Sequence, residues 1–244
     1  MNTLKNPPII EAQVGLKLQT ELSLDILKQV AEKLKSDLPD IKPRFEITTE
    51  VKLDGDVKNQ SSTNINEHGI QLNSANNDFA LILQKDIFIF CALNKYEGWD
   101  SFKRKVSSVL TILSKELPET QFVEIFSRYI NSIVFEAQPL TLSEFFTFIP
   151  KIPTLNPQLT LNGFALNFNA TQANTGFQTF CNFAPRPQPA GVDKVDFILD
   201  LSVSKRVIPV GASDSLWDDL NKARIIKNDL FFGLITDKLK ARYN

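Results

Sequence analysis

Three polar residues placed on candidate strands are the groups of this sequence best suited to chemistry. Arg128 and Asn131 interrupt the apolar stretch 120–136, and Glu11 lies in an apolar stretch near the N-terminus. Arginine presents a planar fork of donors that binds carboxylates and other anions, so Glu11, Arg128 and Asn131 could together form an anion-binding site. The same residues could instead be satisfied polar groups that fix strand register, with Glu11 and Arg128 as an ion pair, because buried polar groups are normally paired with or without a ligand. We favour this second interpretation and keep the first as the alternative.

The other reactive residue types give little support for catalysis. His68 is the sole histidine, and Cys91 and Cys181 stand far apart without a CxxC pattern. A zinc site or a Ser-His-Asp triad would therefore have too few residues to build on. The motifs GxGxxG, GxxxxGK[ST] and GxSxG do not occur in the sequence. We predict no catalytic residue, no metal and no cofactor, and we favour a protein that is not an enzyme.

Composition and charge narrow the classes of partner. The 244 residues are 43% hydrophobic and 23% charged, as in ordinary globular proteins. A net charge of −1 argues against broad electrostatic binding to nucleic acid or to an anionic membrane. Apolar runs are shorter than a membrane span, and the N-terminus lacks the pattern of a signal peptide. Cys91 and Cys181 lie in Phe-rich strand candidates, so we expect inert buried thiols in a cytoplasmic protein.

Hydrophobic periodicity predicts the elements that must position these residues. A period of two predicts strands at 9–18, 44–53, 70–74, 78–84, 87–93, 120–136, 159–170, 176–184 and 192–203. Helical spacing predicts amphipathic helices that begin after Ser23, at Trp99 and after Ser213. The polar stretch 54–68 lacks a period and predicts a surface loop or hairpin tip. Stretch 120–136 is apolar on both faces, so we expect it in the centre of a sheet, covered on both faces.

The last helix carries several basic residues on its predicted surface. Lys222, Arg224 and Lys227 interleave with acidic residues such as Asp219 and Asp229. Such mixed charge is typical of a solvated helix face rather than of a binding surface for an acidic partner.

The order of elements predicts an α+β fold of antiparallel sheets packed with amphipathic helices. Three strands followed by a helix occur twice, at 70–117 and at 159–240. We therefore divide the chain into an N-terminal half, 1–138, which contains the central strand 120–136, and a C-terminal β-β-β-α half, 139–244. Pro150, Pro153 and Pro157 mark the best linker between them. One integrated domain is the alternative, and the repeated order is either a duplication or a coincidence.

Four short motifs resemble a known family. They are Asn6–Ala12 (NPPIIEA), the segment Tyr96–Phe102 with its Tyr-x-Gly-Trp-x-x-Phe pattern, Arg128–Asn131 (RYIN), and the C-terminal FFxLIT pattern of a helix. Their order and spacing are similar to those of a sporadically distributed prokaryotic family of unknown function, over nearly the whole chain. Many members place His after an Ala in the last helix, whereas Arg224 follows Ala223 here. The resemblance therefore implies a fold and no catalytic histidine.

Together these features predict a cytosolic binding or adaptor protein that acts through protein contacts. The alternative is an enzyme or a binder of small anions that uses Glu11, Arg128 and Asn131. A homodimer is one form that the protein contacts could take. Phe145, Phe146 and Phe148 are too dense for one side of a short helix, so we expect some of them to be exposed or covered by a second copy.

Overall fold

The structure, a computed structural model of the chain, describes residues 3–52, 60–94, 96–136, 140–150, 163–188, 191 and 193–244, without the side chains of 50–52 and 60–62. The strands are β1 Ile9–Leu18, β2 Asp40–Lys52, β3 Gln60–Asn73, β4 Phe79–Gln84, β5 Ile87–Leu93, β6 Phe122–Glu136, β7 Leu166–Thr171, β8 Gln178–Arg186 and β9 Lys194–Val210. The helices are α1 Leu24–Leu34, α2 Trp99–Glu116, the short 3-10 helix η1 Leu142–Glu144, α3 Asp214–Leu234 and α4 Asp237–Ala241.

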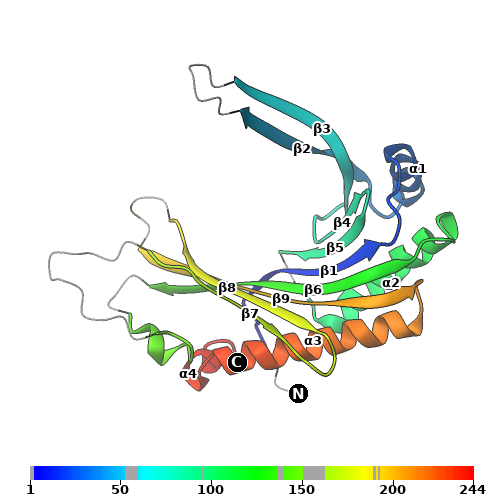
Figure 1. Cartoon of the computed structure of the whole chain (residues 1–244). Coiled ribbons are helices and arrows are strands. Elements are labelled where there is room, and N and C mark those ends of the chain that lie inside the picture. The colour runs from blue at the N-terminus through cyan, green and yellow to red at the C-terminus, as the bar shows by residue number, and fades with distance from the viewer. Residues whose placement is uncertain are drawn as a thin grey trace.

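Within the described ranges, nine strands form one antiparallel sheet in the order β2-β3-β4-β5-β1-β6-β9-β8-β7. Figure 1 shows that the sheet curves, with α1, α2 and α3 on the same side of it, while the β2–β3 hairpin projects from one end. The prediction of an α+β fold built on antiparallel strands is confirmed.

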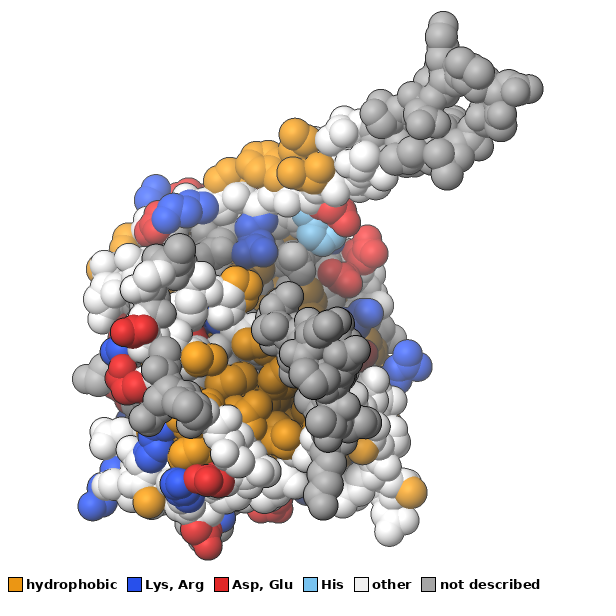
Figure 2. All heavy atoms as spheres, turned by 90° about the vertical axis from the view of Figure 1, so that its left-hand side faces the viewer, with side chains coloured by type: hydrophobic (Ala, Val, Ile, Leu, Met, Phe, Trp, Pro, Cys, Tyr) orange, Lys and Arg blue, Asp and Glu red, His pale blue; other side chains and the backbone are white. Residues whose placement is uncertain are grey.

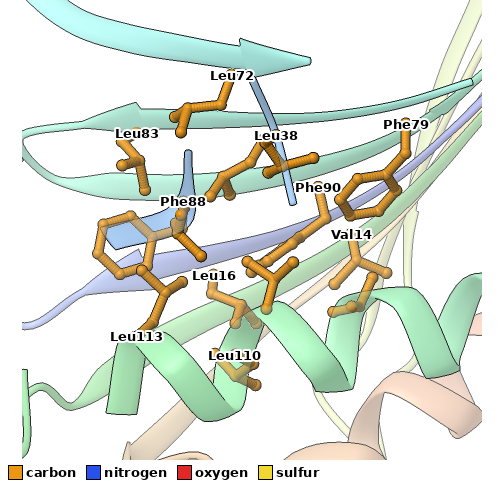
Figure 3. Packing of buried hydrophobic residues seen from close by; sticks show 14 of the residues in the cluster. Val14, Leu16, Leu38, Leu72, Phe79, Leu83, Phe88, Phe90, Leu110 and Leu113 are labelled. Atoms are coloured by element: carbon orange, nitrogen blue, oxygen red, sulfur yellow. The ribbon is translucent and has the colours of Figure 1, made fainter. Parts of the chain in front are cut away.

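Helix α2 is held to the sheet by one apolar face of the inner strands. Val14 and Leu16 of β1 and Phe88 and Phe90 of β5 alternate with residues of the other face, as the period of two requires. They meet the apolar stripe of α2, which includes Leu110 and Leu113 (Figure 3). Because each of these side chains is almost fully buried, this contact forms the larger hydrophobic core.

Strand β6 lies inside the sheet, between β1 and β9, as its two apolar faces predict. The expectation that both faces are covered is wrong within the described residues. Helices cover the face of Tyr129 and Ile133, which are buried, whereas Val134 on the opposite face is 37% exposed. We refer to that opposite face of the sheet, to which no described helix packs, as the open face.

The stretch 54–68, predicted as a surface loop or hairpin tip, belongs in part to a strand of the β2–β3 hairpin. Residues 60–68 belong to β3, and Phe45 to Lys52 of β2 pair with Glu67 to Gln60 in register. Residues 54–59 of the predicted stretch lie outside the described residues. Backbone hydrogen bonds to β2 hold residues 60–68 in this hairpin, so β3 forms here although its sequence has no regular apolar period.

A second core lies at the C-terminal end, where the aromatic segment after β6 packs. Phe146 is 1% exposed and touches Phe135, Phe183 and Phe197, and Phe148 packs on the edge of Phe183. We expected some of Phe145, Phe146 and Phe148 to be exposed or covered by a second copy. Contacts within the chain bury Phe146, and Phe145 and Phe148 are half-buried.

The two predicted halves share the sheet. β6 of the first half pairs with β9 of the second along nearly its whole length, from Phe122–Val210 to Glu136–Lys194. In the sheet order, β5 and β9, which precede α2 and α3, flank the central pair β1–β6 symmetrically. Apart from Pro150, the predicted linker Pro150–Pro157 lies outside the described residues.

Candidate functional site

Arg128 lies on the open face of β6 and forms a bidentate ion pair with Asp200 of β9. Its Nε donates to Asp200 Oδ1 at 2.9 Å and its Nη2 donates to Asp200 Oδ2 at 2.7 Å. The Asp200 side chain is 9% exposed and that of Arg128 is 40% exposed. The hydrogen bonds from Arg128 to Asp200 raise the pKa of the guanidinium, so it stays charged. The fork that could receive a ligand carboxylate is therefore occupied by a carboxylate of the same chain.

Glu11, the acid expected to pair with Arg128, lies nearby but pairs differently. It stands on β1 opposite Ile130, and its carboxylate accepts a hydrogen bond from Gln13 Nε2 at 2.6 Å. Its charge contributes less than Asp200 does to the raised pKa of Arg128. The expected Glu11–Arg128 pair is thus corrected to Arg128–Asp200, because β9 supplies a carboxylate on the other side of β6.

Asn131 does not join Glu11 and Arg128. Positions 128 and 131 are three positions apart along one strand, and an odd step puts their side chains on opposite faces. Asn131 is 2% exposed, and its Nδ2 donates to the carbonyl oxygen of Leu199 at 2.9 Å. The three predicted residues therefore lie in two places: two on the open face, and one on the face that the helices cover.

Asp196, further along β9 on the same face, is also paired within the chain. Asp196 accepts a hydrogen bond from Ser132 Oγ at 2.7 Å and forms an ion pair with Arg186 Nε at 3.3 Å. Cys91 is buried beside Glu11, and burial raises the pKa of its thiol to about 12. A thiol in this state is a poor nucleophile at neutral pH.

Apolar side chains fill the spaces between these pairs on the open face. Phe126, Ile130 and Val134 alternate with Arg128 along β6, and register places Phe180 of β8 and Ile198 of β9 on the same face. The ring of Phe126 lies over Gly15, where an added Cβ would stand 1.8 Å from Phe126 Cε1. The open face is therefore mainly apolar, with internally paired charges.

A cavity of about 370 Å³ lies on the helix-covered side of the sheet. The N-terminal segment, the start of α2 and the middle of α3 enclose it, and its walls include Tyr96, Trp99, Arg224, Lys227 and Phe231. Trp99 Nε1 donates to Asn221 Oδ1 at 2.8 Å, and the Arg224 guanidinium lies 5.7 Å from the Trp99 ring centroid. These contacts join the start of α2 to α3 and hold the cavity's side wall.

Lys227 is the unusual residue of this cavity. It is 6% exposed, and its Nζ lies 3.6 Å from the centroid of the Tyr129 ring. Burial, and then the charge of Arg224, lower the pKa of its amine to about 7. The prediction that Lys227 belongs to a solvated helix face is therefore wrong.

The spacing of the last helix contains the signal that would have found Lys227. Buried residues of α3 follow one another at steps of three and four: Leu216, Leu220, Ala223, Lys227, Phe231 and Leu234. A lysine in the middle of an apolar stripe predicts a buried amine, whatever the charges on the other face.

The described residues offer neither a metal-binding cluster nor a membrane-spanning helix. In the ranges that the structure describes, His, Cys, Asp and Glu side chains form no group of three that could hold a metal ion. None of the described helices combines the length and apolarity needed to cross a membrane.

A scan against protein-family models and a search of curated proteins both find no match. The resemblance carried by the four sequence motifs therefore stays a prediction.

Proposed function

We propose that this protein is a non-enzymatic binding protein that acts through protein contacts, and that a second copy of the chain is its partner. The observation that carries this proposal is the exposed apolar side of the β2–β3 ribbon, which consists of residues 45–52 and 60–67 and extends past the edge of β4. Phe45, Ile47 and Ile65 on this ribbon are 59%, 65% and 63% exposed. Figure 2 shows hydrophobic side chains on the outer surface of the ribbon, and a hollow lined with hydrophobic side chains below it.

The ribbon lacks the support that an isolated hairpin needs. β3 pairs with β4 only over Gly69–Asn73, so residues 45–52 and 60–67 form a two-stranded extension. Two strands without further packing are marginally stable in water. A contact on the apolar side of the ribbon would supply the missing stabilisation.

The ribbon's apolar side is suited to a symmetric contact. Ile47 and Ile65 are directly opposite in register, and Phe45 stands two residues before Ile47, so all three share one face. A two-fold dimer brings the same patch of both subunits together, so this apolar patch meets a matching one. Glu67 lies opposite Phe45 on the same face, where its charge is paired within the chain with Lys28 at 2.8 Å. The net charge of −1 means that two copies repel each other only weakly.

The other polar features support a structural role rather than catalysis. The fork of Arg128 is taken by Asp200, so we assign this pair to strand register and stability. We also propose a cytoplasmic location, which suits two buried cysteines that form no disulfide.

Light scattering coupled to size-exclusion chromatography tests the dimer. We expect the wild type to be dimeric at high concentration and Ile47→Lys to be monomeric with an unchanged circular dichroism spectrum. Ile208→Lys is the matched control, because Ile208 is 88% exposed but lies on β9, away from the ribbon. A wild type that stays monomeric at every concentration, or an Ile47→Lys variant that dimerises like the control, would overturn the proposal.

A further inference from the structure

We propose that the cavity between the N-terminal segment, the start of α2 and α3 binds a small organic anion, whose acid group lies at Lys227 and whose apolar part lies against Trp99 and Phe231. This inference does not depend on the dimer, because the cavity and the ribbon lie on different elements.

The first argument is the state of Lys227. Lys227 lines the cavity, and its amine lies against the Tyr129 ring. Within the described part of the chain, no side chain or carbonyl forms a hydrogen bond or ion pair with it. An amine buried without an acceptor costs free energy, which a bound acid group would recover by accepting its hydrogen bonds.

The second argument is the charge that faces the cavity. Lys5 from the N-terminal segment, Glu97 before α2, and Arg224 and Lys227 from α3 are the charged residues among its described walls. Glu97 is exposed and accepts a hydrogen bond from Ser101 Oγ at 3.1 Å. Basic residues therefore outnumber acidic ones by three to one among these walls, although the whole chain is slightly negative.

The third argument is the shape and lining of the cavity. Its volume of about 370 Å³ falls at the small end of ligand pockets, which suits a single-ring molecule rather than a nucleotide. Pro7, Ile9, Trp99, Phe231 and Phe232 supply the apolar walls. Asn131 and Asn228 add polar atoms to the walls.

Proton uptake on binding gives a signature that a nonspecific contact would not produce. With a pKa of about 7, the Lys227 amine is largely neutral at pH 8. An anion beside it favours the ammonium form, so binding at pH 8 must draw a proton from the buffer. Arg224, Lys5, Glu97 and Tyr96 also face the cavity, so the lysine must be identified by mutation.

Isothermal titration calorimetry tests the site, with benzoate, phenyl phosphate and inorganic phosphate as probes. Each titration is run at pH 8 in two buffers of different ionisation enthalpy. We expect benzoate or phenyl phosphate to bind saturably with proton uptake, and whichever of the two binds tighter identifies the acid group. In Lys227→Met the affinity should fall at least about tenfold, the loss expected for a hydrogen bond to a charged group, and proton uptake should disappear.

The matched control is Lys222→Met, which removes an exposed lysine of the same helix that pairs with Asp219. It should bind like the wild type. Thermal melts check that Lys227→Met is folded, and loss of a buried cation should not lower its melting temperature. Saturable binding of none of the three probes, or equal binding by Lys227→Met, would overturn the site. Inorganic phosphate binding as tightly as phenyl phosphate would overturn the role of the apolar walls.

Discussion

Replacing Arg128 by methionine should lower the free energy of unfolding by about 1–3 kcal/mol, because Asp200 then loses its cation. The size follows from where the two side chains lie. Breaking a fully buried pair from one side costs about 3–5 kcal/mol, and exposed pairs are worth about 0–1 kcal/mol. Asp200 is 9% exposed, but Arg128 is 40% exposed, so solvent screens this pair and the loss falls between those limits. Methionine keeps most of the aliphatic stem and thereby isolates the charge.

Urea denaturation of Arg128→Met, Asp200→Asn and the double variant measures this loss. Because the two residues touch, the double variant should lose less stability than the sum of the two single losses. Arg206→Met is the matched control: Arg206 is an exposed arginine of β9, and its loss should change stability by less than about 0.5 kcal/mol. Additive losses, or an Arg128→Met loss no larger than that of the control, would refute the structural role of the pair. Arg128 would then again be a candidate for ligand binding.

Three further outcomes are expected. Burial lowers the pKa of Lys227 from 10.5 to about 7. Between pH 7 and pH 10.5 the unfolded chain therefore binds a proton that the folded chain does not, so the stability of the wild type rises with pH in this range. Lys227→Met should therefore stabilise the protein by roughly 3–5 kcal/mol below pH 7 and progressively less towards pH 10. Urea denaturation at several pH values measures this gain, and a gain that does not change with pH would contradict the lowered pKa of Lys227. Gly15→Ala must displace the Phe126 ring and should lower stability by about 1 kcal/mol in thermal melts. Adding Phe126→Leu should restore part of this loss, and an unchanged melting temperature in Gly15→Ala would count against this packing. Burial raises the pKa values of Cys91 and Cys181 to about 12, so neither thiol should react with iodoacetamide at pH 8 until urea is added, as mass spectrometry would show.

Local periodicity in the sequence determined most of the individual elements. Ser23 begins α1 as predicted, and its Oγ accepts a hydrogen bond from the Ile26 backbone nitrogen at 3.3 Å. The stripe from Trp99 to Leu113 became α2, and the apolar stretch 120–136 became β6 inside the sheet. These features depend on neighbours three or four residues away in a helix and two away in a strand, so the sequence alone is sufficient to find them.

Two parts of the candidate sites were also present in the sequence but were not drawn from it. The odd separation of Arg128 and Asn131 already places them on opposite faces of one strand. Lys227 stands in the apolar stripe of the last helix, and its spacing from Ala223 and Phe231 predicts burial. In both cases the side-chain period of the strand or helix gives the correct position. The polar character of the residues led instead to a shared site for Arg128 and Asn131 and to an exposed Lys227.

Only the tertiary structure decided which groups meet across elements. Asp200 reaches Arg128 because β9 lies beside β6, and no local pattern of residues 120–136 specifies that neighbour. Strand pairing likewise decided that residues 60–68 form β3, since backbone hydrogen bonds to β2 hold a polar stretch with no side-chain period. The cavity at Lys227 exists because α2 and α3 pack against each other through Trp99 and Asn221, which lie far apart in the sequence. These contacts depend on which elements become neighbours in the fold, and local sequence periodicity does not specify that arrangement.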